Sequence, residues 1–121
     1  MKVLVTGAAG FLGRSLMSRL AADPRRLSLT ALDLPEAIAR ASFNAHVEIV
    51  SCDLRKSEEV AAVLHGRDFD CVGHLAALVS SNDREALWKA NVEATSNLVA
   101  ALSCERLESV LIAGSAAVYG G

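Results

Sequence analysis

The feature that most constrains this 121-residue chain is a short apolar run near its start that breaks into three glycines. Residues 2–6, Lys-Val-Leu-Val-Thr, are typical of a buried strand, and Gly7, Gly10 and Gly13 follow at intervals of three. Glycines at this spacing, between a strand and a helix, are typical of a loop that binds a dinucleotide pyrophosphate. Gly7 would permit the turn, Gly10 would let the backbone approach phosphate, and Gly13 would let the helix pack on the strand. Because strand-to-helix turns of many doubly wound proteins favour glycine, the pattern alone leaves function open.

Composition favours a compact soluble domain and argues against several classes of function. The chain is 52% hydrophobic and 21% charged, and its length predicts one domain over residues 1–121. The net charge is −2 and the basic residues are scattered apart from Arg25-Arg26, so a nucleic-acid partner is not expected. No stretch resembles a membrane span or a charged leader, which predicts a cytoplasmic protein.

Cysteine and histidine usage predicts neither disulfides nor a metal site. The three cysteines form no CxxC pair and are interpreted as reduced, small core residues: Cys52, Cys71 and Cys104. The three histidines lack any ligand spacing and are interpreted as structural: His46, His65 and His74.

Apolar runs alternate with helical stretches along the whole chain, which is typical of a parallel sheet. The expected strands are residues 2–6, 27–32, 47–51, 70–75 and 109–113. Their nearly continuous apolar character predicts that helices cover both faces of the sheet. Right-handed crossovers then give the strand order 3-2-1-4-5, a Rossmann-like, doubly wound α/β fold.

The expected helices are residues 11–22, 36–42, 56–64 and 83–103. In the first, Leu12, Leu16 and Leu20 lie on one stripe that we expect to be core, and Ser57 is a candidate cap for the third. The last helix has a wide apolar face, which serves either a single core or a core together with a neighbouring subunit. Its two expected stripes are Leu87, Asn91, Leu98 and Leu102, and Trp88, Val92, Thr95 and Val99.

Asp33 stands directly after the second expected strand, about 20 residues beyond the glycines. A carboxylate at this place accepts hydrogen bonds from both adenosine ribose hydroxyls and repels a 2′-phosphate, which favours NAD over NADP. Two alternatives remain open. An Asp after a strand is often a helix cap, and Arg14 with the Arg25-Arg26 pair would hold the extra phosphate of NADP.

Asp53 ends the third expected strand at the same edge of the sheet, where ligands of open α/β folds gather. Its carboxylate would accept a hydrogen bond from the adenine amino group while Leu54 packs on the ring. Taken alone, Asp53 is better interpreted as a cap for the helix that begins near Lys56.

Six short motifs together resemble the extended short-chain dehydrogenase/reductases, and in particular the N-terminal part of an NAD-dependent epimerase/dehydratase. They occur in that family's order and approximate spacing: residues 6–13, Asp33-Leu34, Asp53-Leu54, His74-Leu75-Ala76-Ala77, Asn91-Val92 and Ser115-Ala116-Ala117-Val118-Tyr119-Gly120. The likeness extends over essentially the whole chain, and six motifs in order are far more specific than the glycines alone.

The resemblance implies a role for each matched position. The backbone of Gly10, Phe11 and Leu12 would contact the pyrophosphate, Asp33 and Leu34 the adenosine ribose, and Asp53 and Leu54 the adenine. Leu75, Ala76 and Ala77 would line the cofactor after the fourth strand, and Asn91 would lie near the active site. Ser115 matches the catalytic Ser/Thr position, whose hydroxyl binds the substrate oxygen at the carbon that exchanges hydride. The family also typically dimerises through the helix matched by residues 83–103.

The sequence departs from the family at its general acid/base. In that family a Tyr acts with a Lys four positions later, but Tyr119 matches a Val-Tyr-Gly turn and is followed by Gly120 and Gly121 only. Without that pair hydride transfer loses about 10²–10⁴-fold in rate. We therefore expect an incomplete NAD(P)-binding domain, without the later strands and the substrate lobe, that turns over substrate poorly by itself.

Three hypotheses for function follow. The first is the NAD-binding portion of an oxidoreductase or epimerase acting at a carbinol carbon of a sugar nucleotide. The second is a dehydrogenase of the same family acting on sugar acids such as erythronate. The third, from another class, is a non-catalytic NAD sensor. A Walker-type ATPase is disfavoured because no Gly-Lys-Ser/Thr follows the loop, and a methyltransferase because Thr6 and not an acid precedes Gly7.

Overall fold

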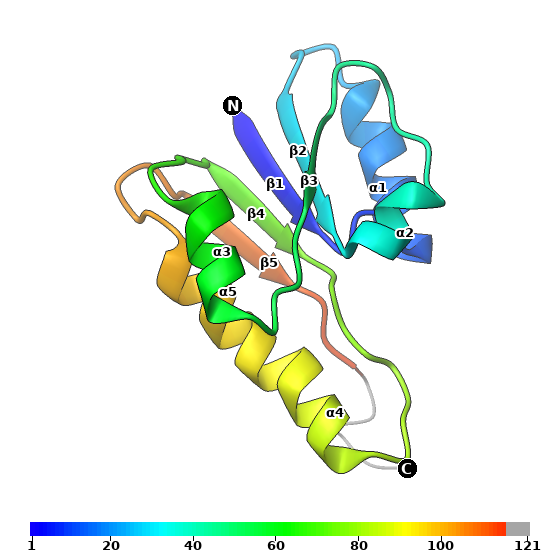
Figure 1. Cartoon of the computed structure of the whole chain (residues 1–121). Coiled ribbons are helices and arrows are strands. Elements are labelled where there is room, and N and C mark those ends of the chain that lie inside the picture. Colours follow the sequence, from blue (N-terminus) through cyan, green and yellow to red (C-terminus); the bar gives the residue numbers. More distant parts are fainter. Residues whose placement is uncertain (116–121) are drawn as a thin grey trace.

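A five-stranded parallel sheet forms the centre of the protein, and its strand order is β3-β2-β1-β4-β5 (Figure 1). The computed structural model describes residues 1–115. The strands are β1 Lys2–Thr6, β2 Ser28–Asp33, β3 Glu48–Ser51, β4 Cys71–His74 and β5 Ser109–Ile112. The predicted fold class and strand order are therefore confirmed, and no strand boundary shifts by more than one residue.

Alternating side chains of the central strand divide the core into two clusters. Val3 and Val5 of β1 belong to one cluster, whereas Leu4 lies in the other, on the opposite face of the sheet. Helix α1, Phe11–Ala21, contributes Met17 to the first cluster. On the other face, α3 and α5 contribute Val60, Leu64, Ala94 and Leu98. Figure 1 shows α1 and α3/α5 on opposite sides of the sheet.

The other helices follow the expected order with different bounds. They are α2 Pro35–Ala39, α3 Ser57–Leu64, α4 Arg84–Trp88, η1 Lys89–Glu93 and α5 Ala94–Ala101. Helix α2 begins with proline at its first position, which suits the fixed φ of that residue. The predicted cap Ser57 is wrong: Lys56 is the N-cap residue of α3, and it makes no side-chain cap hydrogen bond.

The expected helix over residues 83–103 is one helical path with a π-helical turn in its middle. Asp83 caps it by accepting hydrogen bonds from the N–H groups of Glu85 and Ala86. The π-helical segment η1 then separates α4 from α5. The two expected stripes do not both reach the core. Ala94 and Leu98 are buried, whereas the second stripe exposes three of its apolar members: Trp88, Val92 and Val99.

Three other burial predictions need correction. Helices do not cover both faces at the edges of the described sheet, because β5 exposes Val110, Leu111 and Ile112. Leu12 lies 62% exposed on the first turn of α1 and is not core. Cys104 is exposed, although Cys52 is buried and Cys71 half-buried. In each case the side chain lies where the described chain offers no element to pack against.

Candidate functional site

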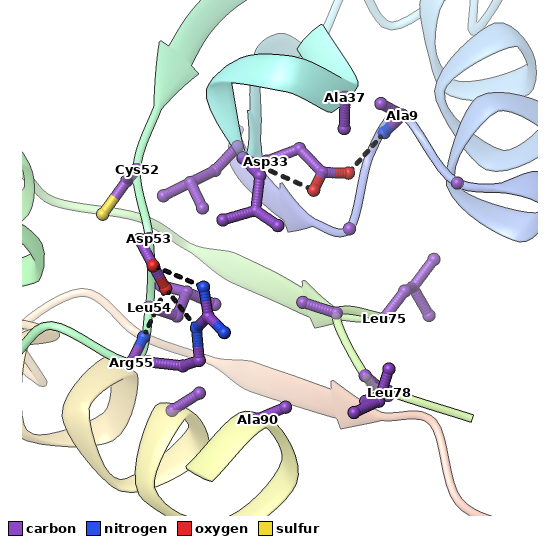
Figure 2. A pocket seen from close by; sticks show the side chains of 17 residues that line it. Ala9, Asp33, Ala37, Cys52, Asp53, Leu54, Arg55, Leu75, Leu78 and Ala90 are labelled. Atoms are coloured by element: carbon purple, nitrogen blue, oxygen red, sulfur yellow. Dashed lines mark hydrogen bonds and ion pairs between the residues drawn. The ribbon is translucent and has the colours of Figure 1, made fainter. Parts of the chain in front are cut away.

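A cleft of about 370 Å³ opens at the carboxyl ends of the strands, where the strand order reverses between β1 and β4 (Figure 2). This is the position at which open α/β folds bind ligands. The cleft brings together residues that are up to 87 positions apart along the chain. Its lining is Gly7, Ala9, Gly10, Leu32, Asp33, Leu34, Ala37, Cys52, Asp53, Leu54, Arg55, Leu75, Ala76, Ala77, Leu78, Ala90 and Ala94.

The glycine loop is packed too tightly for side chains at two of its three glycines. Gly7 has a φ of 67°, and a Cβ there would lie 2.6 Å from the backbone nitrogen of Ala76. A Cβ on Gly13 would lie 2.1 Å from the carbonyl oxygen of Gly7. The loop is therefore held against both the chain after β4 and the first turn of α1. At Gly10, a Cβ would come within 3.3 Å of the Gly7 oxygen.

The amino end of α1 lies beside the loop and is equipped to bind an anion. Its N-cap residue is Gly10, and in the described residues no side chain caps it and no acidic group occupies its first turn. The first hydrogen bond of this helix joins the Arg14 N–H to the Gly10 carbonyl. The N–H groups of the first turn and the positive end of the helix dipole therefore remain for a ligand. Phe11 and Leu12 point their side chains outward, since both are exposed.

Asp33 ends β2 at the rim of the cleft, and backbone N–H groups hold its carboxylate. Oδ2 accepts a hydrogen bond from Ala9 of the glycine loop at 2.9 Å, and Oδ1 accepts one from Leu34 at 2.8 Å (Figure 2). No ion pair to this carboxylate occurs within residues 1–115. Since an ionised carboxylate has about four acceptor positions, each oxygen retains capacity for a ligand hydroxyl. Asp33 is not the cap of α2, whose N-cap residue is Leu34.

Asp53 follows β3 on the other side of the cleft, and the side chain of Arg55 clamps it. Arg55 Nε donates to Oδ1 at 2.9 Å and Nη2 to Oδ2 at 2.8 Å, while the Arg55 N–H also donates to Oδ1 at 3.0 Å (Figure 2). These hydrogen bonds hold the pKa of Asp53 below its ordinary value. The alternative that Asp53 caps α3 is wrong, because Lys56 is the N-cap residue of that helix.

Small and apolar residues form the floor of the cleft after β4. Leu75, Ala76 and Ala77, which the family resemblance implies would line the cofactor, all line the cleft. The Ala76 N–H donates to Thr6 Oγ1, which ties this segment to the end of β1. Next to it, Leu54 lines the cleft from the β3 side.

The side chain of Asn91 binds protein backbone and does not line the cleft. It accepts a hydrogen bond from the Leu78 N–H at 2.8 Å and donates one to the Leu78 carbonyl at 2.9 Å. Asn91 therefore fixes the segment after β4 to η1, whose Ala90 does line the cleft. Ser115 is exposed, beyond the carboxyl end of β5. The remainder of its motif, including Tyr119, lies outside the described residues.

Comparison with known proteins assigns the chain to a family. The model of the NAD dependent epimerase/dehydratase family matches residues 3–121. The chain belongs to this family. Among curated relatives, UDP-glucose 4-epimerase 3 of Oryza sativa subsp. japonica is 29% identical over 133 residues, which are 98% of this chain and 35% of that protein. D-erythronate dehydrogenase of Cupriavidus necator is 34% identical over 134 residues, which are 100% of this chain and 40% of that protein.

Solved structures of the family agree with the fold. A mutant uronate dehydrogenase from Agrobacterium tumefaciens, complexed with NAD, superposes with a TM-score of 0.73 at 28% identity. The match covers 94% of this chain and 40% of that one. The chain thus spans 35–40% of the length of these relatives.

Arg25 and Arg26, two of the three cations that would favour NADP, lie at the end of β2 opposite the cleft. Arg25 and Arg26 precede β2, at the amino ends of the strands, whereas Asp33 is the last residue of β2, at the opposite end. Arg25 forms a bidentate pair with Asp23. Arg14 lines a separate hollow beside residues 42–44. The alternative that these arginines hold a 2′-phosphate is therefore wrong for Arg25 and Arg26 on geometry.

Several residues of the cleft were not predicted from the sequence. The charged one is Arg55, and the Asp-x-Arg spacing would have indicated it, because residues two apart in a turn bring their side chains together. No sequence pattern indicates that Ala37, Ala90 and Cys52 line the cleft, because their small side chains reach it only through the packing of the elements that carry them. Burial raises the pKa of the Cys52 thiol to about 11, so it stays protonated.

The described residues include neither a cluster of metal-ligating side chains nor a membrane-spanning helix. Over residues 1–115 no group of three or more His, Cys, Asp or Glu side chains is arranged to hold a metal ion. None of the helices described there has the length and apolar character needed to cross a bilayer.

Proposed function

We propose that this chain binds NAD in the cleft at the carboxyl edge of the sheet, with Asp33 recognising the adenosine ribose. The observation that carries the proposal is the arrangement of Asp33 and the glycine loop. The Ala9 N–H of the loop orients the Asp33 carboxylate, and the same loop presents the uncapped amino end of α1. A pyrophosphate and a ribose are neighbours in a dinucleotide, and so are the groups that would bind them here.

The pyrophosphate would bind to backbone of the glycine loop and α1. Gly7, Gly10 and Gly13 keep side chains out of the loop, and N–H groups at Phe11 and Leu12 lie in the first turn of the helix. This binding uses main-chain groups and the helix dipole, which explains why the site needs no cluster of lysine or arginine.

NAD is favoured over NADP by the charge of Asp33. Both of its oxygens have free acceptor positions for ribose hydroxyls, and no described cation neutralises its charge. A 2′-phosphate would bring a second anion to this carboxylate and would be repelled. Leu34 packs beside the same position in the cleft.

The adenine would lie between β3 and the segment after β4. Leu54 presents an apolar surface to one side of the cleft, and Leu75, Ala76 and Ala77 present small or apolar side chains opposite. Asp53 would accept from the adenine amino group through a free acceptor position, while Arg55 keeps the carboxylate ionised. In this proposal Asn91 supports the cofactor indirectly, through its two hydrogen bonds to Leu78.

For the whole protein we propose hydride transfer at a carbinol carbon of a sugar-nucleotide-like substrate. The support is the family, which includes UDP-glucose 4-epimerases that match 98% of this chain. NAD, when bound, supplies the hydride acceptor. Ser115, at the carboxyl edge beyond β5, would bind the substrate oxygen. The 121 residues hold one tyrosine and no Tyr-x-x-x-Lys segment, so alone they would bind cofactor without turning over substrate.

A sugar-acid dehydrogenase is the second candidate, and two observations favour it. D-erythronate dehydrogenase is 34% identical over the whole chain, and uronate dehydrogenase gives a TM-score of 0.73. The two candidates differ in redox balance. An epimerase oxidises and then reduces one substrate without net NADH, whereas a dehydrogenase of a sugar acid releases NADH. Incubating the natural full-length protein with NAD and either a UDP-sugar or an aldonic or uronic acid, and following NADH absorbance, separates them.

A second copy of the chain would pack on the exposed face of the helical path from α4 to α5. Trp88, Val92 and Val99 form an outward apolar patch there, with Trp88 57% exposed. The expected result is a dimer in light scattering, and Trp88→Glu would convert it to a monomer. A wild-type monomer at micromolar concentration would contradict this arrangement.

Calorimetric titration with NAD, NADP and S-adenosylmethionine tests the cofactor proposal directly. We expect NAD to bind most tightly, NADP more weakly and S-adenosylmethionine not detectably. A folded protein with no affinity for NAD at millimolar concentration would refute the proposal. A protein that binds NAD but never reacts with a sugar substrate, even at natural full length, would instead be an NAD sensor.

A further inference from the structure

We propose that His74 is a positioning residue for the dinucleotide cleft. Its neutral imidazole connects β1, the strand that leads into the glycine loop, to α5 on the opposite side of the cleft. This inference rests on the proposed function because it concerns the same cleft. It comes from hydrogen bonds beneath the cleft, made by side chains to which the sequence assigns no part in cofactor binding.

The imidazole of His74 makes a hydrogen bond at each of its two nitrogens. His74 ends β4 and lies in register beside Thr6, the last residue of β1. Nδ1 lies 2.6 Å from Thr6 Oγ1, and Nε2 lies 2.8 Å from Thr95 Oγ1 of α5. The Thr6 side chain is fully buried and His74 is nearly so. One side chain thus spans β1, β4 and α5.

The direction of each hydrogen bond follows from the groups at the two ends of this series of hydrogen bonds. Thr95 Oγ1 donates its only hydrogen to the Asn91 carbonyl at 2.8 Å, so its oxygen must accept from His74 Nε2–H. A neutral imidazole then has a bare Nδ1, which accepts from the Thr6 hydroxyl. Thr6 Oγ1 in turn accepts from the Ala76 N–H at 3.4 Å. Only the Nε2–H tautomer of the neutral ring satisfies every group.

Protonation of His74 would break this arrangement. A proton on Nδ1 would face the Thr6 hydroxyl, whose hydrogen would then have to find another acceptor in a site closed to water. The groups that face the ring are the hydroxyls of Thr6 on β1 and Thr95 on α5, and in register on β5 the apolar Ile112. No described charged group is among them, and burial lowers the pKa of His74. The neutral ring is therefore the stable form at neutral pH.

The hydrogen bonds of His74 connect the two sides of the cleft to one buried side chain. On one side Thr6 directly precedes Gly7, which packs against the backbone of Leu75 and Ala76. On the other side Thr95 holds the Asn91 carbonyl in η1, the π-helical turn that places Ala90 in the cleft. Loss of the His74 link would let the loop and this wall move relative to each other, which would weaken binding of a ligand that contacts both.

The matched variants are Thr95→Val, which removes the acceptor for Nε2–H at nearly constant shape, and Thr95→Ser, which retains the hydroxyl. In the natural full-length protein we expect Thr95→Val to weaken NAD binding about fivefold and Thr95→Ser to restore it. Proton–nitrogen correlation spectra of the imidazoles should show the Nε2–H tautomer for His74, assigned by its loss in His74→Asn. Thr95→Val should give a mixture of tautomers because Nε2–H loses its acceptor, and a merely structural role would leave NAD affinity unchanged in this variant.

Val60→Ala is the control for lost stability, because Val60 is buried in the core and forms no part of the network. It should lower the free energy of unfolding without changing NAD affinity. Three results would overturn the role of His74 while leaving the proposal of NAD binding intact. They are equal weakening of NAD binding in Val60→Ala, an NAD affinity of Thr95→Val within twofold of wild type, and an Nδ1–H tautomer of His74. Failure of the wild-type protein to bind NAD would overturn both proposals.

Discussion

Asp33 and Asp53 each begin an Asp-Leu pair at the same edge of the sheet, yet the fold uses their charges differently. Asp33 is the last residue of β2, and Asp53 lies two residues beyond the end of β3. Asp33 accepts hydrogen bonds from two backbone N–H groups, whereas Asp53 is clamped by the guanidinium of Arg55. A carboxylate oriented by neutral groups keeps its charge available to a ligand. One that is paired with a cation presents a nearly neutral surface.

The difference arises from what approaches each carboxylate. The glycine loop brings the Ala9 N–H to Asp33 from 24 positions away, so this environment depends on the packing of β1, the loop and α1. The clamp on Asp53 comes from Arg55, two positions along the chain, and forms within one turn. The first environment is tertiary and the second is local, so they should respond to different substitutions.

The largest effect is expected from Gly13→Ala, which disturbs the environment of Asp33 alone. Its Cβ would lie 2.1 Å from the Gly7 oxygen and would force the loop away from α1. We expect the free energy of unfolding to fall by about 1–3 kcal/mol and NAD binding to become undetectable. Urea denaturation and calorimetry measure the two quantities.

Gly66→Ala is the matched control for this substitution. Unlike Gly13, Gly66 has a positive φ, of 72°, but a Cβ there would meet nothing within 4 Å. This variant should lose about 1 kcal/mol of stability from the backbone conformation and keep its affinity for NAD. Unchanged NAD binding in Gly13→Ala would show that the loop is not the binding element.

Next in size is Asp33→Ala, which removes the recognition proposed for the ribose. Loss of hydrogen bonds from two hydroxyls to a charged group should weaken NAD binding about tenfold to a hundredfold and narrow the difference between NAD and NADP. Asp33→Asn should lie between wild type and Asp33→Ala for NAD and should improve NADP. An unchanged cofactor preference in calorimetry would contradict the ribose role.

Arg55→Ala should have a smaller effect, because it breaks a pair that is partly exposed. The Arg55 side chain is 51% exposed and that of Asp53 12%. We expect the free energy of unfolding to fall by about 0.2–1 kcal/mol and NAD affinity to change by less than about threefold. If Arg55→Ala weakened NAD binding as much as Asp33→Ala does, the contrast between the two carboxylates would fail, and Arg55 would be a cofactor ligand.

The smallest effect is expected from Asp53→Asn, on the free energy of unfolding at acid pH. The pKa of Asp53 is lower in the folded protein than its ordinary value of 3.8, so the unfolded chain binds a proton more readily. The stability that Asp53 contributes is present above about pH 4 and is lost as the pH falls through its folded pKa. Asp53→Asn should flatten this acid limb by less than about 1 kcal/mol in urea denaturation between pH 5 and pH 2.5. Parallel limbs in the two proteins would show that the clamp adds nothing to stability.

Much of the fold could be predicted because its signals are periodic or local. The strand order follows from alternating strands and helices with right-handed crossovers, and it is confirmed as β3-β2-β1-β4-β5. The glycines mark the turn at Gly7 and the close packing at Gly13 because no other residue fits there. The π-helical turn over Lys89–Glu93 escaped prediction, since it adds one residue to a turn without any residue type that demands it.

The candidate site was predictable as a set of positions and not as a set of contacts. The motifs name Asp33, Asp53 and Asn91, but no periodicity indicates that the Ala9 N–H holds Asp33 or that Asn91 binds the backbone of Leu78. The network of His74 likewise depends on Thr6 and Thr95, which lie 68 and 21 positions away. Hydrogen bonds over such separations are set by how the sheet and helices pack.

By itself the sequence determined the doubly wound sheet, the place of the glycine loop and the edge at which the acidic residues gather. These depend on backbone conformation and on the burial of apolar side chains, which are properties of short segments. The tertiary structure alone decided which N–H group of the glycine loop holds the Asp33 carboxylate, which face of the last helical path is buried, and which groups His74 joins. Each of these is a choice among partners that lie far apart along the chain, and only packing of the whole sheet brings one of them within hydrogen-bond distance.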